Sequence, residues 1–224
     1  MNAIEIRNLT FSYDGKRRIL DNINIDIEKG TVTGIVGDSG KGKSTLCHIL
    51  CGVIPHAIGG ALYGNVSIGL RNGERYLLRD LNLSDIAEMV GFVMQDSDRQ
   101  IVSSTVEDEL AFGPENMCVE PEDIRRRVDS VLKLLGIENI RYTNPNNLSG
   151  GQKRLVAIGS MLTMDQDIII MDEPYSALDE RGRDRVHSAI KLLREMGKTI
   201  LIVEHDREMI KDVDRIICLN ELTG

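Results

Sequence analysis

The sequence predicts an α/β fold built around a mostly parallel sheet. Three short runs, Val32–Val36, Ile168–Met171 and Thr199–Val203, are largely apolar and rich in β-branched residues. Such continuous runs are typical of strands buried on both faces, as at the centre of a parallel sheet. Segments with helical spacing alternate with them, which is the pattern of an α/β protein with helices on both faces of the sheet.

The N-terminal part of the chain has a different pattern. Residues 3–13 alternate loosely between apolar and polar side chains, and Ile19–Glu28 alternates strictly. Alternation of this kind indicates strands with one face buried and one face in water, which is common in antiparallel sheets. We therefore expect an N-terminal antiparallel β subdomain next to the parallel core.

Helical spacing recurs in four segments between and after these strands: Lys43–Ile54, Pro121–Leu135, Gly151–Met164 and Asp179–Met196. Residues 105–164 read almost wholly as helix. We expect one domain over residues 1–224 that contains an inserted helical subdomain at approximately residues 96–165. The loop Gln95–Ser104 leads into this subdomain.

Composition limits the classes of function. The chain has 27 Lys and Arg against 35 Asp and Glu, a formal net charge of −8, which argues against a general nucleic-acid partner. Cys47 and Cys51 lie four residues apart on a predicted helix, where buried reduced thiols are favoured over a metal site. The N-terminus lacks the pattern of a signal peptide, and no apolar run is long enough to span a membrane.

A phosphate-binding loop follows the first buried strand. Its pattern is complete in the residues Gly37-Asp38-Ser39-Gly40-Lys41-Gly42-Lys43-Ser44. Glycines allow backbone N–H groups to surround phosphate oxygens, and the start of the following helix adds positive potential. We expect the Lys43 ammonium to reach the β- and γ-phosphates and the Ser44 hydroxyl to ligate Mg²⁺. Lys41 either lies in solvent or adds a second cation beside the phosphates.

Two carboxylates end the buried run Ile168–Met171. In open α/β sheets, ligands bind at the carboxyl ends of the strands, so Asp172 and Glu173 should face the same place as the phosphate loop. Adjacent residues of a strand point in opposite directions, which favours two different roles. Asp172 suits the Mg²⁺ shell, and Glu173 suits the polarisation of an attacking water.

A second glycine-rich helix start lies upstream of these acids, at Leu148-Ser149-Gly150-Gly151-Gln152. Ser149 can cap the helix, and by itself the segment also fits an ordinary N-cap. As a whole pentapeptide ahead of Asp172 and Glu173, it resembles the signature motif of the ABC ATPases. The chain is therefore similar to the nucleotide-binding domain of an ABC transporter, which implies a phosphate-loop NTPase core.

This resemblance extends over nearly the whole chain and implies further site residues. Gln95 corresponds to the glutamine that senses Mg²⁺ and the membrane partner, and His205 to the histidine that senses the γ-phosphate. Tyr13 matches the aromatic residue that stacks on adenine. Thr45 belongs to the nucleotide-binding segment, together with Gly37–Ser44 and Ser149–Gln152. Ser176-Ala177-Leu178-Asp179 resembles the loop that crosses between two subunits.

A finer resemblance rests on Gln95–Asn116 and on Ile202–Asp206, which are similar to the ATPases of energy-coupling factor and cobalt or nickel importers. It implies ATP and Mg²⁺ as cofactors, integral membrane transport subunits as partners, and a second ABC ATPase, identical or related. It also implies uptake of a vitamin or a transition metal ion by a protein peripheral to the cytoplasmic face of the cell membrane. Ile54-Pro55-His56 followed by Gly59-Gly60 resembles the vitamin branch.

A soluble ABC ATPase is the alternative, with a cluster-assembly scaffold as its strongest form. The stretch between Lys43 and Ser149 has no sustained heptads, unlike the long coiled coil of chromosome-type members. The chain ends soon after the predicted strand Arg215–Leu219, where many relatives in this branch continue. A naturally short subunit, one half of a fused pair and a shortened chain all remain open.

Overall fold

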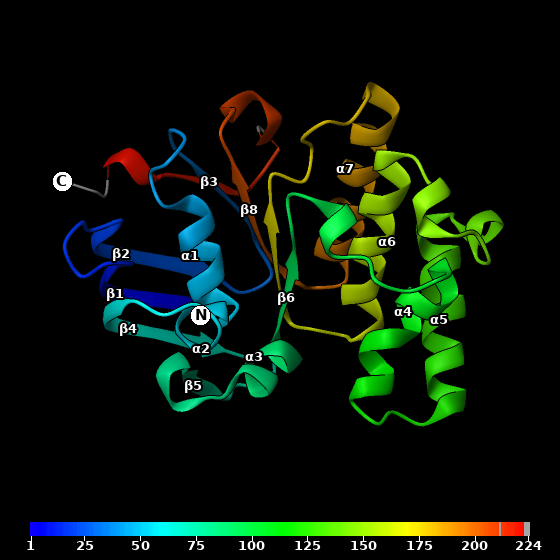
Figure 1. Cartoon of the computed structure of the whole chain (residues 1–224), viewed down its shortest axis with the longest axis horizontal. Coiled ribbons are helices and arrows are strands. Elements are labelled where there is room, and N and C mark those ends of the chain that lie inside the picture. The colour runs from blue at the N-terminus through cyan, green and yellow to red at the C-terminus, as the bar shows by residue number, and fades with distance from the viewer. Residues whose placement is uncertain (211, 222–224) are drawn as a thin grey trace. The chain divides into compact units, whose positions relative to one another are not determined.

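The computed structural model describes residues 1–210 and 212–221. Figure 1 shows the whole chain, coloured by residue number. The contacts within the chain divide it into two units. The first unit contains Met1–Phe92, Asp167–Glu173 and Arg194–Gly224, and the second contains Val93–Gln166 and Pro174–Leu193. In the part of the chain that is described, no helix combines the length and the apolar character required to cross a membrane.

An antiparallel sheet forms the N-terminal part of the first unit, as the alternation predicts. Its strand order is β2 (Leu20–Glu28), β1 (Asn2–Ser12), β4 (Ala61–Gly69) and β5 (Arg75–Leu77). Ile4 and Ile6 of β1 lie opposite Ile27 and Ile25 of β2 in register, and all four are buried. The inward-facing isoleucines thus supply one wall of the core.

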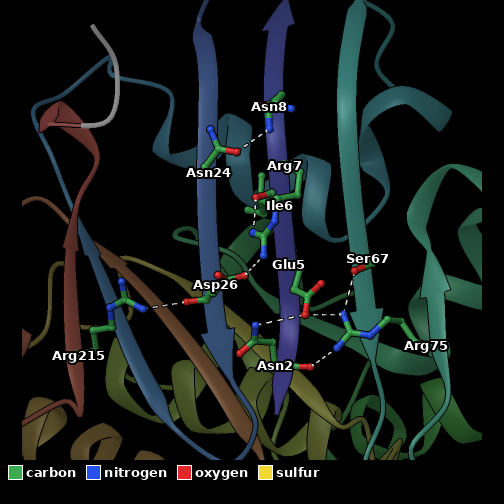
Figure 2. Close-up of polar contacts among 10 residues, drawn as sticks. All are labelled: Asn2, Glu5, Ile6, Arg7, Asn8, Asn24, Asp26, Ser67, Arg75 and Arg215. Carbon is green, nitrogen blue, oxygen red and sulfur yellow. Dashed lines mark hydrogen bonds and ion pairs between the residues drawn. The ribbon is translucent and has the colours of Figure 1, made fainter.

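The opposite face of this sheet is polar (Figure 2). The Arg7 guanidinium lies 2.7 Å from the Asp26 carboxylate, and Arg75 lies 3.2 Å from Glu5. Arg215 donates to the backbone carbonyl of Asp26 at 3.1 Å and so links the last strand of the core sheet to β2. These cross-strand pairs explain why polar residues occupy the alternate positions.

The core sheet of the first unit has the order β6 (Val90–Val93), β7 (Ile168–Asp172), β8 (Thr199–Glu204), β3 (Val32–Val36) and β9 (Arg215–Cys218). Strand β3 pairs in parallel with β8 and β9, and β7 pairs in parallel with β8. Every residue of β3, β7 and β8 is buried, which confirms the prediction drawn from their continuous apolar runs.

The helices of the first unit are α1 (Lys43–Leu50), α2 (Val53–His56) and α3 (Leu83–Met89). The sequence predicts a single helix over Lys43–Ile54, but α1 ends earlier because Gly52 adopts a left-handed conformation with φ +76°. A Cβ atom at Gly52 would lie 2.6 Å from Cδ1 of Ile86, so this glycine also permits the close approach of α3.

The second unit contains α4 (Val106–Asn116), α5 (Pro121–Leu135) and α6 (Gly150–Thr163), and α7 (Glu180–Glu195) begins within it. Figure 1 shows α4, α5 and α6 packed together. The bounds of α5 agree with the prediction, and α6 begins one residue earlier than predicted. Short 3₁₀ turns lie at Leu78–Asp80, Ser97–Arg99, Glu138–Ile140, Pro145–Asn147, Arg207–Ile210 and Leu219–Glu221.

Candidate functional site

The phosphate-binding loop connects β3 to α1 in the first unit, in the context that its motif requires. Lys43 is the first residue of α1, and its side chain is only 6% exposed. Its ammonium donates to the backbone carbonyls of Gly37 at 2.8 Å and Asp38 at 3.1 Å. The loop therefore curls around the lysine, while Lys41 and the loop tip stay exposed.

Gly42 fixes the junction between this loop and α1. It is the N-cap residue of the helix and has φ +89°, a conformation that other residues rarely adopt. A Cβ atom there would lie 2.8 Å from Cδ2 of Leu20 and 3.0 Å from the carbonyl oxygen of Ile19. The turn therefore needs glycine both for its dihedral angle and for its space.

Asn220 contacts the phosphate loop from a distant part of the sequence, and no sequence motif predicts this contact. Its side-chain oxygen accepts a hydrogen bond from the backbone N–H of Asp38 at 3.2 Å. The 3₁₀ turn that carries Asn220 follows β9, which pairs with β3, so sheet pairing brings this distant residue to the loop. No local motif marks such a contact.

The two predicted acids lie at the carboxyl end of β7. Asp172 is the last strand residue and is 5% exposed. Burial raises the pKa of its carboxyl group above the ordinary value, a hydrogen bond with the Ser44 side chain lowers it, and the charge of Glu173 raises it further. This hydrogen bond brings together two of the three side chains predicted to contact Mg²⁺, and Gln95 is the third.

Glu173 lies beyond the end of β7, so the alternation of side chains along a strand does not explain why Asp172 and Glu173 differ in environment. Its φ of +46° lies in the left-handed region, and its backbone N–H donates to the carbonyl of Val203 at 2.9 Å. A non-glycine residue in this region carries conformational strain, which is common at functional sites. The change of backbone direction gives Glu173 a side chain that is 18% exposed, unlike the buried Asp172.

His205 directly follows β8 and lies beside Glu173. The Nδ1 atom of His205 is 3.6 Å from Oε1 of Glu173 and 3.6 Å from Oε2 of Glu204. Because β7 and β8 are neighbouring parallel strands, their carboxyl ends place these side chains together. The proximity of Glu173 and His205 therefore follows from the sheet order.

Tyr13 follows β1 and contacts the first turn of α1. Its hydroxyl lies 3.0 Å from the hydroxyl of Thr45, and its ring packs edge-on against Phe11 with centroids 4.8 Å apart. The side chain remains 47% exposed. An anchored aromatic ring with an open face, next to the phosphate loop, is suited to stacking on a planar base.

The first unit fits a magnesium nucleotide by the chemistry of its donors. Two neutral carbonyl oxygens hold the buried ammonium of Lys43, so its charge is available to phosphate oxygens. The hydroxyl of Ser44 and the carboxylate of Asp172, which share a hydrogen bond, are oxygen donors of the kind that Mg²⁺ prefers, and Mg²⁺ is typically bound by one or two carboxylates together with substrate phosphates.

The signature segment lies in the second unit. Ser149 is the N-cap of α6: its hydroxyl accepts from the N–H of Gln152 at 3.3 Å, and the Gln152 side chain accepts from the N–H of Ser149 at 2.9 Å. This reciprocal capping box confirms the predicted capping by Ser149. A hollow of about 320 Å³ lies beside the helix start, with Gly150 and Arg181 among its lining residues.

The loop Ser176–Asp179 packs against this helix start. Asp179 accepts a hydrogen bond from the N–H of Gly182 at 2.8 Å and so caps the first turn of α7. A Cβ atom on Gly151 would lie 3.0 Å from Cα of Gly182, so two glycines allow the starts of α6 and α7 to touch. The signature segment and the loop predicted to cross between subunits therefore lie side by side.

Gln95 also belongs to the second unit, two residues after the end of β6. Its backbone carbonyl accepts a hydrogen bond at 2.6 Å from the guanidinium of Arg154, a buried residue that no sequence motif marks. Lys43, Ser44, Asp172, Glu173, His205 and Tyr13 thus lie in the first unit, whereas Gln95 and Ser149–Gln152 lie in the second.

Comparison with known sequences assigns these features to one family. Residues 20–176 match the sequence family described as ABC transporter. The energy-coupling factor transporter ATP-binding protein EcfA of Methanosarcina acetivorans is 40% identical over 218 residues, covering 97% of this chain and 76% of that protein. The cobalt import ATP-binding protein CbiO of Syntrophus aciditrophicus is 40% identical over 220 residues, covering 97% of this chain and 75% of that protein.

A solved structure is similar over nearly the same extent. It is cbiO1 of Clostridium perfringens, described as part of the ABC transporter complex cbiONQ, with a TM-score of 0.84 and 32% identity. The match covers 97% of this chain and 84% of that one. The predicted fold class is thereby confirmed. The chain belongs to the ABC transporter family, as an ATP-hydrolysing member of the branch that includes the energy-coupling factor and cobalt import ATP-binding proteins.

Proposed function

We propose that this chain is the ATPase subunit that energises a membrane importer, with a vitamin or a transition metal ion as the transported substrate. One domain over residues 1–224, with a helical subdomain at approximately residues 96–165, would perform this function. The observation that carries the proposal is the presence in one chain of a buried phosphate-loop lysine, Lys43, and a capped signature helix at Ser149. The names of the relatives, energy-coupling factor and cobalt import proteins, support the importer class.

Residues of the first unit would hold the nucleotide. The Lys43 ammonium would exchange its two carbonyl partners for β- and γ-phosphate oxygens, and Tyr13 would stack on the base. Ser44 and Asp172 would hold Mg²⁺, which neutralises phosphate charge when bound. Gln95, from the second unit, keeps its proposed role as a further Mg²⁺ contact on the strength of the family resemblance.

Glu173 would act on the attacking water. A carboxylate that is partly exposed and adjacent to the metal ligand Asp172 can accept a hydrogen bond from water and orient it. His205, 3.6 Å from the same carboxylate, would restrain its position and donate to the γ-phosphate. The left-handed backbone conformation of Glu173 turns the chain away from the strand direction, and the side chain is left partly exposed and available for this role.

ATP would close two subunits into a head-to-tail pair. Each nucleotide would contact Gly37–Thr45 of one subunit and Ser149–Gln152 of the other. The capped helix start of α6 offers N–H groups and positive potential to the γ-phosphate. Binding of ATP then stabilises the closed pair, and hydrolysis releases it.

The membrane partner would contact the segment Gln95–Ser104 in the second unit. This segment carries the acids Asp96 and Asp98, with side chains 51% and 68% exposed, which suit a basic helix of an integral membrane subunit. Docking there would hold the chain at the cytoplasmic face of the membrane. It would also connect the movement of ATP-driven closure to the transport subunit.

Co-purification tests the importer proposal against the soluble alternative. The tagged chain is isolated with its co-expressed membrane subunits from membranes solubilised in a mild detergent. The importer proposal predicts an integral membrane protein in fixed proportion to the chain, and a second ABC ATPase or a second copy. A cluster-assembly scaffold would instead elute from the soluble fraction with soluble partners, which would contradict the proposal.

A further inference from the structure

The segment that follows β6 is not part of the strand, and side chains form hydrogen bonds with its backbone groups. The N–H of Met94 donates to the side-chain oxygen of Gln100 at 2.9 Å, and the carbonyl of Met94 accepts from the Arg154 guanidinium. The other arm of the same guanidinium donates to the carbonyl of Gln95 at 2.6 Å. One arginine thus holds two consecutive peptide groups at the position where the predicted Mg²⁺ contact lies.

Arg154, which forms these two hydrogen bonds, is unusual for an arginine because it is buried. Its side chain belongs to α6, is 3% exposed, and stands five residues after the N-cap Ser149. A buried charge is costly unless it is hydrogen-bonded, and the planar fork of arginine can satisfy two carbonyl oxygens at once. Such a residue in a well-formed helix gives a short and stiff connection between Gln95 and Ser149.

Two further contacts fasten the same segment to the helices of the second unit. Lys153 of α6 forms an ion pair with Asp98. The buried carboxylate of Glu109, in α4, accepts hydrogen bonds from the N–H groups of Val102 and Ser103, each at 3.0 Å. Residues 94–103 are therefore held at both ends, and Arg154 is the contact nearest to Gln95.

We propose that Arg154 is a positioning residue that sets the place of Gln95 and makes residues 94–103 and the start of α6 move as one body. The inference deepens the proposed function and rests on it for the role of Gln95. A partner seated on residues 96–104 would then shift the signature helix directly through the guanidinium. All of these contacts lie within the second unit.

Hydrogen exchange of the nucleotide-free chain tests the connection without relying on activity. Arg154→Met keeps an unbranched side chain that fills part of the same space but removes both donors, so amides in residues 94–101 should exchange about tenfold faster, equivalent to about 1.4 kcal/mol. Arg154→Lys, which retains the charge but lacks the planar fork, should give a smaller increase. Exchange at the parental rate in this segment would overturn the proposal.

Arg127→Met is the matched control. Arg127 extends from α5 and donates to the backbone carbonyl of Thr163 at the end of α6, at 2.9 Å, so it also bonds a helix to a carbonyl in this unit. Its loss should loosen the contact between α5 and α6 and leave residues 94–101 at the parental exchange rate. If both variants accelerate exchange throughout the second unit alike, Arg154 is a general structural residue and the proposal fails.

A double-mutant cycle with Gln95→Ala separates this inference from the proposed function. Arg154→Met should raise the Mg²⁺ concentration for half-maximal ATP hydrolysis, and the same change should have no further effect when Gln95 is already alanine. If the two substitutions have additive effects on the Mg²⁺ dependence, Arg154 does not act through Gln95, and the positioning role is overturned. If Gln95→Ala leaves the Mg²⁺ dependence unchanged, the proposed role of Gln95 fails, whereas hydrogen exchange still decides whether Arg154 holds residues 94–101 in place.

Discussion

The Nδ1 atom of His205 lies 3.6 Å from Oε1 of Glu173, although 31 residues of sequence separate the two. The parallel pairing of β7 with β8 brings them together, because each residue directly follows the last residue of its strand. Glu173 leaves its strand with a left-handed backbone, so its carboxylate can face both His205 and a water molecule. This pair is the structural basis of the hydrolytic role proposed for the first unit.

Lys43→Ala should weaken ATP binding. The change removes the ammonium that is proposed to hold the β- and γ-phosphates, so affinity should fall by at least about tenfold, or about 1.4 kcal/mol. Titration calorimetry measures the effect directly. Lys133→Ala, at an exposed position in the last turn of α5, is the control for a general loss of positive charge. Equal ATP affinity in the Lys43 variant and the parent would refute the assignment of the phosphate loop.

Gly42→Ala and Gly40→Ala form a matched pair that separates dihedral strain from steric conflict. Both glycines have left-handed φ values, +89° and +78°. A Cβ atom at Gly42 would meet Leu20 at 2.8 Å, whereas nothing lies within 4 Å of one at Gly40. We expect the Gly42 variant to lose about 1–3 kcal/mol more stability than the Gly40 variant in urea unfolding. Equal losses would show that the packing around Gly42 is not tight.

Cys47 and Cys51 should react with a thiol reagent more slowly than Cys118. Burial raises the pKa of the Cys51 thiol to about 11 and the pKa of Cys47 well above its usual range. Near neutral pH both therefore remain protonated, and the thiol is far less reactive than the thiolate. Cys118 is exposed and should react fastest. Rapid modification of Cys47 or Cys51 in the native chain, before urea is added, would contradict their burial in the hydrophobic core.

Charge reversal at Asp96 and Asp98 should abolish assembly with the membrane subunits while ATP binding is retained. Both acids lie in the segment proposed to receive a basic helix, and repulsion replaces attraction in the variant. Asp123→Lys is the control, because Asp123 pairs with Arg126 three residues later just as Asp96 pairs with Arg99. Detergent co-purification gives the readout. Normal assembly of the doubly reversed chain would move the docking surface elsewhere.

The sequence predicts best the features that depend on local pattern. The strands β3, β7 and β8 are buried on both faces, so their apolar runs are continuous and easily recognised. Strand β4 is missed because its first half carries exposed residues and a glycine, and it is buried only toward its end. The predicted helix Lys43–Ile54 is too long, because a left-handed glycine inside an apolar pattern gives no periodic signal.

Tertiary contacts account for what the sequence cannot predict at the site. The phosphate-loop motif identifies Lys43 and Ser44, and the end of a buried strand identifies Asp172. Their proximity can be predicted because the carboxyl ends of the strands in a parallel sheet lie at one edge. By contrast, Asn220 reaches the phosphate loop through the pairing of β9 with β3, and Arg154 reaches Gln95 through the packing of α6. Neither residue stands in a recognisable motif, since each acts on backbone groups far away in the sequence.

The Glu173→Gln variant tests the central claim, that Glu173 drives hydrolysis and that ATP closes a pair of subunits. Glutamine preserves size and shape but removes the basic acceptor, so hydrolysis should fall by roughly 10²–10⁴-fold. ATP should still bind, because Lys43, Ser44 and Asp172 remain. With ATP and Mg²⁺, light scattering should show the variant as a dimer, while the parent is mostly monomeric after turnover. Hydrolysis at the parental rate would contradict the assignment of Glu173 as the catalytic residue. An inactive variant that remains monomeric with ATP would contradict the pairing of two identical chains and point to a non-identical partner ATPase.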